Sequence, residues 1–271
     1  MNTKVQSEIL EFFKCSRIPF IERTKSSFNY NEFDTNMAML SPVFYSRQIA
    51  SVTGAAGAGK SSLIFYSVNE LDPSEFRVVS TELSNPNKKA LYKTIALKLG
   101  LKPSFYPEDI KNQIITFFNQ ENSQGKFNCV IIDECHTLSI PMFDEIRSFY
   151  DEGGNFSLIL AGLPLLLNHL NLSVNLSLKQ RISVFIDCGV LTLSQTKEYI
   201  NHQLNISKCK NQIIDEGCFS IVHSLASGSP RKINQFLYAA MCEAYKDKTS
   251  IITDEILKKV EVKLAYGQQR L

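Results

Sequence analysis

The sequence predicts an α/β protein: a parallel five-stranded sheet with helices on both faces, followed by a small helical domain. Two observations carry this prediction. Apolar runs of strand length alternate with helical stretches up to about residue 190, and only helical patterns follow residue 191. Continuous apolar runs are typical of parallel strands because both faces of the sheet are covered. We therefore expect two domains, 1–190 and 191–271.

The expected strands are rich in β-branched and aliphatic residues, and they are 48–53, 76–83, 128–133, 156–162 and 184–190. Two helices between them have clear ends. The segment 87–100 spaces its apolar residues four apart and stops at Gly100, a residue typical of helix C-caps. The segment 107–120 opens with a proline and two acidic residues, which suits a helix N-terminus. In the second domain the helical patterns are 196–206, 211–226, 230–245 and 253–266.

Composition narrows the class of protein. The 271 residues are 44% hydrophobic and 21% charged, which is ordinary for a globular chain, and the net charge is +2. Such a charge gives no general attraction to nucleic acid, so DNA binding would need a local patch. The seven cysteines include no Cys-x-x-Cys pair, and we expect reduced thiols in a cytoplasmic protein. No signal-peptide core is visible, and no window approaches the roughly 20 apolar residues of a membrane span.

A phosphate-binding motif follows the first expected strand. Residues 54–61, Gly-Ala-Ala-Gly-Ala-Gly-Lys-Ser, fit G-x-x-x-x-G-K-[ST] and precede a helical run. Glycines let backbone N–H groups converge on phosphate oxygens, and the helix N-terminus favours an anion. We expect Lys60 to reach the β- and γ-phosphates of ATP and Ser61 to bind Mg²⁺. The other residues expected around the phosphates are Gly54, Gly57, Ala58, Gly59 and Ser62. A glycine-rich turn that matches by chance is the alternative.

Two adjacent acids end the third expected strand, in "CVIIDECH". Carboxylates at the end of a buried strand are costly unless they have a function. We expect Asp133 to hold Mg²⁺ and Glu134 to polarise the attacking water. The alternative is a solvated acidic turn. For His136 we expect a structural role, because none of the four histidines pairs with another at ligand spacing.

Three further segments, together with these two motifs, resemble the AAA+ ATPases of the ExeA type. They are "FFKCSRIPF" (12–20), "LPLLLNHL…LSLKQRI" (163–182) and "ASGSPRKINQF" (226–236), and the resemblance spans about 12–265. Stand-alone members of this type are similar to the MuB/TnsC/IstB transposition helpers, which assemble on DNA with ATP and recruit a transposase. The lack of a visible membrane segment or further domain favours this type over the secretion-associated one.

The resemblance implies roles for further residues. Arg181 matches an arginine finger that acts on the nucleotide of a neighbouring subunit, and Arg231 matches a sensor-2 arginine that touches the γ-phosphate. Pro19 and Phe20, within an N-terminal helical segment 1–46, match the segment near the adenine. The alternatives are an arginine at a helix C-terminus, a surface charge on the helical domain, and plain core packing.

One position departs from the family pattern. Leu163 stands where the family has a polar residue, in Gly-Gln-Pro, that helps to orient the water, and leucine cannot donate a side-chain hydrogen bond. We therefore expect slow ATP hydrolysis that assembly or partners stimulate. For duplex DNA, the resemblance points to Lys88, Lys89 and Lys93, with a solvated helix face as the alternative.

The resulting expectation is a cytoplasmic ATPase that forms a ring or helical filament on duplex DNA with ATP and Mg²⁺ and regulates or recruits a transposase. Two alternatives stay open. One is a secretion-associated ATPase that acts with membrane partners, and the other is a nucleotide-dependent scaffold of low turnover.

Overall fold

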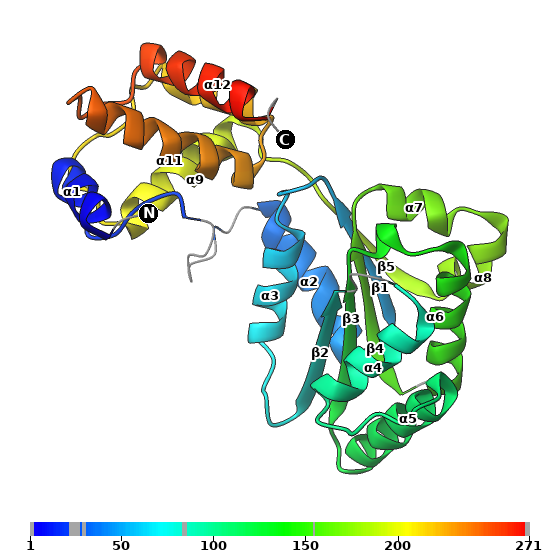
Figure 1. Ribbon diagram of the computed structural model, residues 1–271. Coiled ribbons are helices and arrows are strands. Elements are labelled where there is room, and N and C mark those ends of the chain that lie inside the picture. The colour runs from blue at the N-terminus through cyan, green and yellow to red at the C-terminus, as the bar shows by residue number, and fades with distance from the viewer. Residues whose placement is uncertain (1–2, 22–27, 29–30, 83–85, 154, 269–271) are drawn as a thin grey trace. The chain divides into compact units, whose positions relative to one another are not determined.

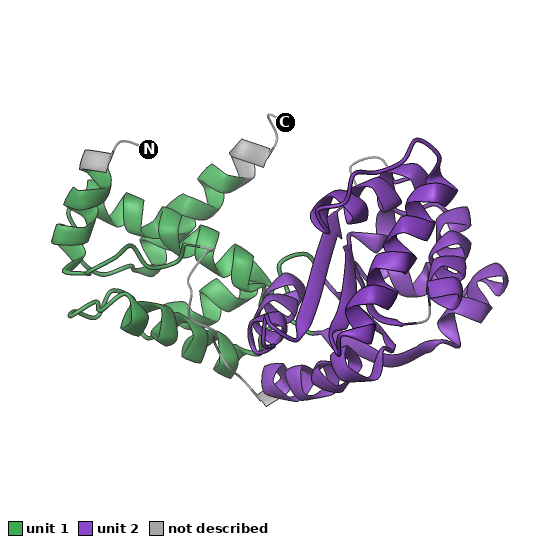
Figure 2. Ribbon diagram, turned by 90° about the horizontal axis from the view of Figure 1, so that it is seen from below, with its two compact units in different colours: residues 1–30, 56–58, 189–271 green, residues 31–55, 59–188 purple. Residues whose placement is uncertain are grey.

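The computed structural model describes residues 3–21, 28, 31–82, 86–153 and 155–268, and the chain divides into two compact units. Unit 1 comprises Met1–Tyr30, Ala56–Ala58 and Gly189–Leu271, and unit 2 comprises Asn31–Ala55 and Gly59–Cys188 (Figure 2).

Unit 2 is built on the predicted five-stranded sheet. Its strands are β1 (Ile49–Gly54), β2 (Phe76–Glu82), β3 (Phe127–Asp133), β4 (Phe156–Gly162) and β5 (Ile182–Cys188). They are all parallel, in the order β2-β3-β4-β1-β5. The predicted α/β fold is confirmed, with each strand within two residues of its expected bounds. Leu83, the last residue of the second predicted strand, lies outside the described residues.

Helices cover both faces of this sheet (Figure 1). The helices of unit 2 are α2 (Asn31–Ser46), α3 (Lys60–Asn69), α4 (Lys88–Lys98), α5 (Pro107–Ser123), α6 (Ile140–Gly153), α7 (Leu165–Leu170) and α8 (Leu176–Lys179), with short 3₁₀ turns η1 (Cys135–Thr137) and η2 (Ser173–Asn175). Val130, Ile132 and Leu158 belong to one buried cluster with the apolar faces of α4, α5 and α6. Successive strand residues point to opposite faces, so the alternate positions face α2 and α3.

Unit 1 is a helical bundle. Its helices are α1 (Thr3–Phe13), α9 (Leu193–Ile206), α10 (Cys218–Ala226), α11 (Pro230–Lys246) and α12 (Asp254–Gln268). Ile9 and Phe13 of α1 are buried in one apolar cluster with Ile200 and Leu237. Residues 1–30 therefore group with the C-terminal helices, whereas the predicted division at residue 190 placed them in the first domain.

One predicted helix of unit 1 is shorter than expected. The pattern over 211–226 becomes helical only at Cys218, because Ile214 forms an isolated β-bridge with Ile252. The Asp215 side chain then accepts the Gly217 N–H at 3.0 Å, which makes a local turn before the helix.

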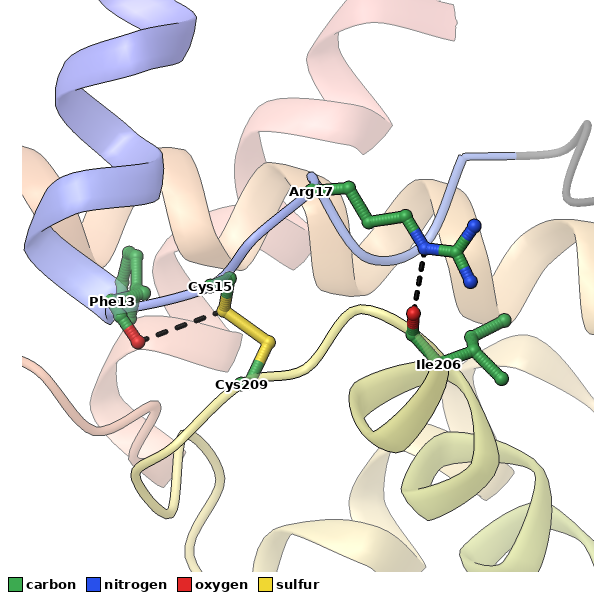
Figure 3. Close-up of a disulfide and its surroundings, with 5 residues drawn as sticks. All are labelled: Phe13, Cys15, Arg17, Ile206 and Cys209. Carbon is green, nitrogen blue, oxygen red and sulfur yellow. Dashed lines mark hydrogen bonds between the residues drawn. A yellow bond between two sulfur atoms is a disulfide. The ribbon is translucent and has the colours of Figure 1, made fainter.

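A disulfide joins Cys15 to Cys209 within unit 1 (Figure 3). The prediction of reduced thiols is wrong for this pair and agrees with the structure for the other five cysteines. The two cysteines are 194 residues apart in the sequence, and the fold brings them together. The Ser16 backbone N–H donates to Ser207 O at 3.0 Å, and the Arg17 side-chain Nε donates to Ile206 O at 2.7 Å, so hydrogen bonds also connect the N-terminal segment to the end of α9.

Within the described part of the chain, no helix combines the length and the apolar character needed to cross a membrane.

Candidate nucleotide-binding site

The register of the sheet gathers the predicted site residues of unit 2 at one edge. Gly54 at the end of β1 is the partner of Cys188, and Thr53 is the partner of Gly162. Asp133 ends β3, with β4 between it and β1. Neighbouring strands lie about 4.8 Å apart, which puts Asp133 about 10 Å from Gly54 along this edge. The carboxyl ends of parallel strands are where open α/β sheets bind ligands.

The loop after β1 requires glycine where the backbone passes close to its neighbours. A Cβ at Gly54 would lie 2.5 Å from the carbonyl oxygen of Cys188, so a side chain at this position would collide with β5. Gly59 precedes α3 with a left-handed φ of 98°, a conformation that glycine adopts without strain. The loop therefore delivers the first turn of α3, with its unpaired N–H groups, to the carboxyl edge of the sheet.

Lys60 is the first residue of α3 and is buried. Its Nζ donates to the carbonyl oxygens of Gly54 at 2.8 Å and Ala55 at 3.1 Å, which holds the ammonium over the loop. Burial raises the pKa of the nearby Cys188 thiol to about 11, and the Lys60 charge only partly offsets this, so the thiol stays neutral at pH 7. Ser61 and Ser62 follow in the first turn with exposed side chains, while Ala58 is buried.

The acid pair occupies a strained turn at the end of β3. The Asp133 carboxylate accepts the Glu134 N–H at 2.8 Å. Glu134 has φ 57° and ψ 30°, a left-handed conformation that is uncommon outside glycine and asparagine. Such strain persists where the surrounding structure fixes it, and it is concentrated at functional sites. The turn leaves the Glu134 side chain 43% exposed at the edge of the sheet.

His136 connects this turn to the end of β4, a contact that sequence reasoning missed. The backbone N–H of Leu163 donates to His136 Nδ1 at 3.3 Å, and His136 Nε2 lies 3.5 Å from Glu134 Oε2. Because Nδ1 accepts a hydrogen bond, the neutral ring carries its proton on Nε2, which faces the carboxylate. Leu163 is thus connected to Glu134 through its backbone N–H and the His136 ring.

The remaining residues predicted to bind the nucleotide belong to unit 1. Loop residues 56–58 group with this unit, where Ser229 Oγ donates to the Ala56 carbonyl at 3.4 Å. A Cβ at Gly57 would lie 2.7 Å from the Cβ of Arg231, in the first turn of α11, so the loop and the helix are in close contact there. Pro19 and Phe20 are buried, and Phe20 lies in the apolar cluster of this unit. Their predicted place beside the adenine stays a prediction.

Arg181 lies at the amino ends of the strands, which form the opposite edge of the sheet and are called the amino edge below. It precedes Ile182, the partner of Ile49 at the start of β1, and Gly54 is five positions further along that strand, about 17 Å away at 3.3 Å per residue. The guanidinium is partly exposed, and its Nε donates to Asp151 Oδ1 at 2.6 Å. Asp151 also accepts from Arg147 at 3.0 Å. The structure therefore places Arg181 apart from the phosphate loop of its own chain.

The three predicted DNA-contacting lysines lie on α4 with different partners. Lys88 pairs with Glu108 at 2.8 Å, and this carboxylate raises the pKa of the lysine. Lys89 Nζ lies 4.3 Å from the centre of the Phe105 ring, and Lys93 is exposed one turn further along the helix. Their role in DNA binding stays a prediction.

Comparisons with known proteins identify the fold. Residues 45–170 match the family model of an AAA domain. The ORC2 protein of Aeropyrum pernix, solved with ADPNP and ADP, superposes with a TM-score of 0.71 at 11% identity over 90% of this chain and 70% of that one. Cdc6p of Pyrobaculum aerophilum gives 0.72 at 14% identity over 89% and 69%.

The ORC1 protein of Aeropyrum pernix in complex with DNA gives 0.66 at 14% identity over 96% and 69%. No curated protein sequence matches the chain. The fold is thus that of an AAA+ P-loop protein with a helical C-terminal region.

Proposed function

We propose that the protein binds ATP with Mg²⁺ at the carboxyl edge of its sheet and hydrolyses it. The observation that carries this proposal is the convergence of the glycine loop, Lys60 and the Asp133–Glu134 pair at one edge, which the strand register dictates. The match of residues 45–170 to an AAA domain supports it.

The residues at this edge fit a nucleotide and its metal ion. A loop that excludes side chains at Gly54 and a helix N-terminus at Lys60 suit phosphate oxygens. Ser61 and Asp133 supply the oxygen ligands that Mg²⁺ prefers, and this ion commonly shares its ligands with substrate phosphates. The described residues contain no group of three or more His, Cys, Asp or Glu side chains placed to hold a metal ion, so the proposed Mg²⁺ site depends on the phosphates for further ligands. When bound, Mg²⁺ neutralises charge on the phosphates.

The residues of this chain have distinct tasks in the proposed reaction. Lys60 holds the terminal phosphates, and Glu134 accepts a proton from the attacking water. His136 acts as a positioning residue, because its ring is held by the Leu163 N–H and faces the Glu134 carboxylate. This contact restricts the position of the proposed base in a protein that has Leu163 where the family has a polar side chain.

Arg181 serves a different nucleotide in this proposal. A guanidinium about 17 Å along the strand direction from its own loop cannot neutralise charge there. It is partly exposed and is held by Asp151, so it can be presented to the site of a neighbouring copy. Arg231, whose Cβ lies beside Gly57, is proposed as the arginine of the helical domain that contacts the γ-phosphate.

We further propose that copies assemble with ATP on duplex DNA and regulate or recruit a transposase. Support for DNA comes from the exposed lysines of α4 and from the fold neighbour solved in complex with DNA. Support for the transposase comes from the resemblance of residues 12–20, 163–182 and 226–236 to transposition helper ATPases. Weak phosphate contacts from many copies add up along one DNA backbone.

One observation favours a second candidate function, a nucleotide-dependent scaffold of low turnover. Leu163 offers only its backbone N–H near Glu134, and that N–H is already engaged by His136. In this second candidate function the chain therefore binds ATP but hydrolyses it slowly.

The test measures ATP binding and steady-state ATP hydrolysis, each with and without duplex DNA and over a range of protein concentrations. ATPase activity per subunit that rises with concentration and with DNA supports the proposed enzyme. Tight, Mg²⁺-dependent binding without turnover under any condition supports the scaffold, and absence of ATP binding contradicts both.

A further inference from the structure

The loop between α4 and α5 exposes two large aromatic side chains next to lysines. Phe105 is 74% exposed and Tyr106 65% exposed, and their ring centres are 5.2 Å apart in an edge-to-face arrangement. Exposed aromatic residues that lie together usually mark a binding surface, because water solvates them poorly. The pattern "KPSFYPE" carried no such signal in the sequence, since burial of both rings was equally compatible with it.

This loop is held firmly in place. Gln113 of α5 accepts the Ser104 N–H at 3.1 Å and donates to the Lys102 carbonyl at 3.5 Å. Prolines at 103 and 107 fix φ on both sides of the aromatic pair. A rigid loop presents its side chains to a ligand with little loss of conformational entropy on binding.

The charge around the rings is positive. Lys89 Nζ lies 4.3 Å from the centre of the Phe105 ring. Lys93 is exposed one turn of α4 after Lys89, and Lys102 is exposed in the loop that carries the two rings. No carboxylate of the described residues is within ion-pair distance of these three lysines, whereas Glu108 is already paired with Lys88 and Lys111. Asp109, beside Glu108 at the start of α5, is a second exposed acid there. We call Lys89, Lys93, Lys102, Phe105 and Tyr106 the aromatic–basic surface.

A groove runs beside this surface along α5. Its volume is about 610 Å³, and Lys102, Asp109, Asn112, Gln113 and Thr116 are among the residues that line it. The Asn112 amide and the Thr116 hydroxyl can each donate and accept hydrogen bonds, as the edges of nucleobases require.

We propose that the aromatic–basic surface binds DNA whose bases are unstacked, with the rings of Phe105 and Tyr106 against base faces and the lysines against phosphates. The inference rests on the proposed DNA binding and specifies the form of DNA. Charge complementarity selects a polyanion, and exposed rings select a polyanion with free π-faces, which is single-stranded or distorted DNA. An intact duplex offers phosphates to the lysines but buries its base faces, and contacts to phosphates alone would not need the rings.

The test compares three fluorescently labelled DNAs by anisotropy: a duplex, the same duplex with a central unpaired bubble, and oligo-dT of equal length. The full chain is measured with a non-hydrolysable ATP analogue and without nucleotide. We expect the bubble and oligo-dT to bind about tenfold more tightly than the duplex, because stacking of bases on aromatic side chains stabilises such complexes.

Two variants identify the cause. Phe105→Ala with Tyr106→Ala should remove this preference and leave duplex binding within about twofold, since phosphate contacts are independent of the rings. Phe65→Ala, which removes an aromatic residue 57% exposed on α3, is the matched control and should keep the preference. Circular dichroism and ATP binding show that each variant is folded.

Each outcome decides between the two levels of the proposal. The inference is overturned if the wild type does not prefer the bubble and oligo-dT to the duplex, or if the double variant keeps this preference. In either case, ATP-dependent binding to the duplex would still support the proposed function. Absence of binding to any of the three DNAs overturns both. If the double variant binds every DNA normally but loses a partner protein, the surface is a protein-docking site and the inference is wrong.

Discussion

The two edges of the sheet in unit 2 carry charged groups of different kinds. At the carboxyl edge, Lys60 at the start of α3 and the Asp133–Glu134 pair at the end of β3 lie on the same side of the sheet as the loop after β1. At the amino edge, Arg181 projects beside β5 and pairs with Asp151, far from that loop. In the proposed function, the residues of the carboxyl edge bind a nucleotide within one chain, whereas Arg181 acts on a nucleotide bound by a second copy. Nucleotide binding and hydrolysis should therefore respond differently to changes at the two edges.

The largest overall loss is expected from Lys60→Ala, because a chain that cannot bind ATP loses both hydrolysis and ATP-dependent assembly. Loss of the buried ammonium should weaken ATP binding about 100-fold or more, because charge-assisted hydrogen bonds to phosphate are among the strongest in proteins. Isothermal titration with a non-hydrolysable analogue measures this, with Lys93→Ala as a control for loss of one positive charge. Unchanged affinity in a folded variant would show that the carboxyl edge is not the nucleotide site.

Arg181→Ala should leave nucleotide binding by the single chain intact and lower kcat about 1,000-fold, the magnitude found for arginine fingers. Arg147→Ala is the matched control, since Arg147 also pairs with Asp151 but lies within α6. Steady-state ATPase of both variants is compared under assembling conditions. Equal losses in the two would indicate a structural role for Asp151 and its partners instead.

Glu134→Gln should bind ATP normally and hydrolyse it about 100-fold more slowly or worse, because the amide cannot accept the proton. Asp133→Asn should instead weaken the Mg²⁺-dependent part of binding. Titrations with and without Mg²⁺, together with single-turnover hydrolysis, separate these effects. Turnover at the wild-type rate in both variants would show that the acid pair has only a structural role in the turn.

A smaller effect is expected from His136→Ala, which frees the Glu134 side chain from its contact at 3.5 Å. We expect kcat to fall about tenfold while KM stays unchanged, as for a group that acts only through the base. His136→Gln, which can still place an N–H near Glu134, should recover part of the rate. A variant that loses ATP binding, or in which glutamine rescues nothing, would count against positioning.

Leu163→Gln should have the smallest effect: a basal ATPase rate that is unchanged or modestly raised, because a polar side chain is restored near the nucleotide. The backbone N–H that holds His136 is retained in this variant. A large loss of activity in a folded protein would show that the leucine side chain itself is required.

The sequence predicted those features of the fold and of the candidate site that depend on local patterns. The phosphate loop and the acid pair are contiguous motifs, and buried strands such as 128–133 are continuous apolar runs, so both were visible without the fold. Contacts between segments that are distant in the sequence could not be predicted in this way. Cys15 and Cys209 are 194 residues apart, and nothing in their spacing indicates that they pair.

The same limit applies near the site. His136 reaches Leu163 only because β3 and β4 are neighbours in the sheet, which no local pattern encodes. Helical periodicity likewise could not show that Ile214 would bridge to Ile252 and delay α10. The exposure of Phe105 and Tyr106 depends on how the loop leaves α4, since the same residues could have been buried.

The most direct test of the central claim mixes two inactive variants. Arg181→Ala and Glu134→Gln proteins are combined at several ratios with duplex DNA, ATP and Mg²⁺, and the ATPase rate is measured. If the two edges belong to sites shared between copies, mixed assemblies contain some complete interfaces and activity returns at intermediate ratios. A mixture of Lys60→Ala with Glu134→Gln, in which both defects fall on the same edge, should stay inactive. No recovery with Arg181→Ala at any ratio would contradict the account.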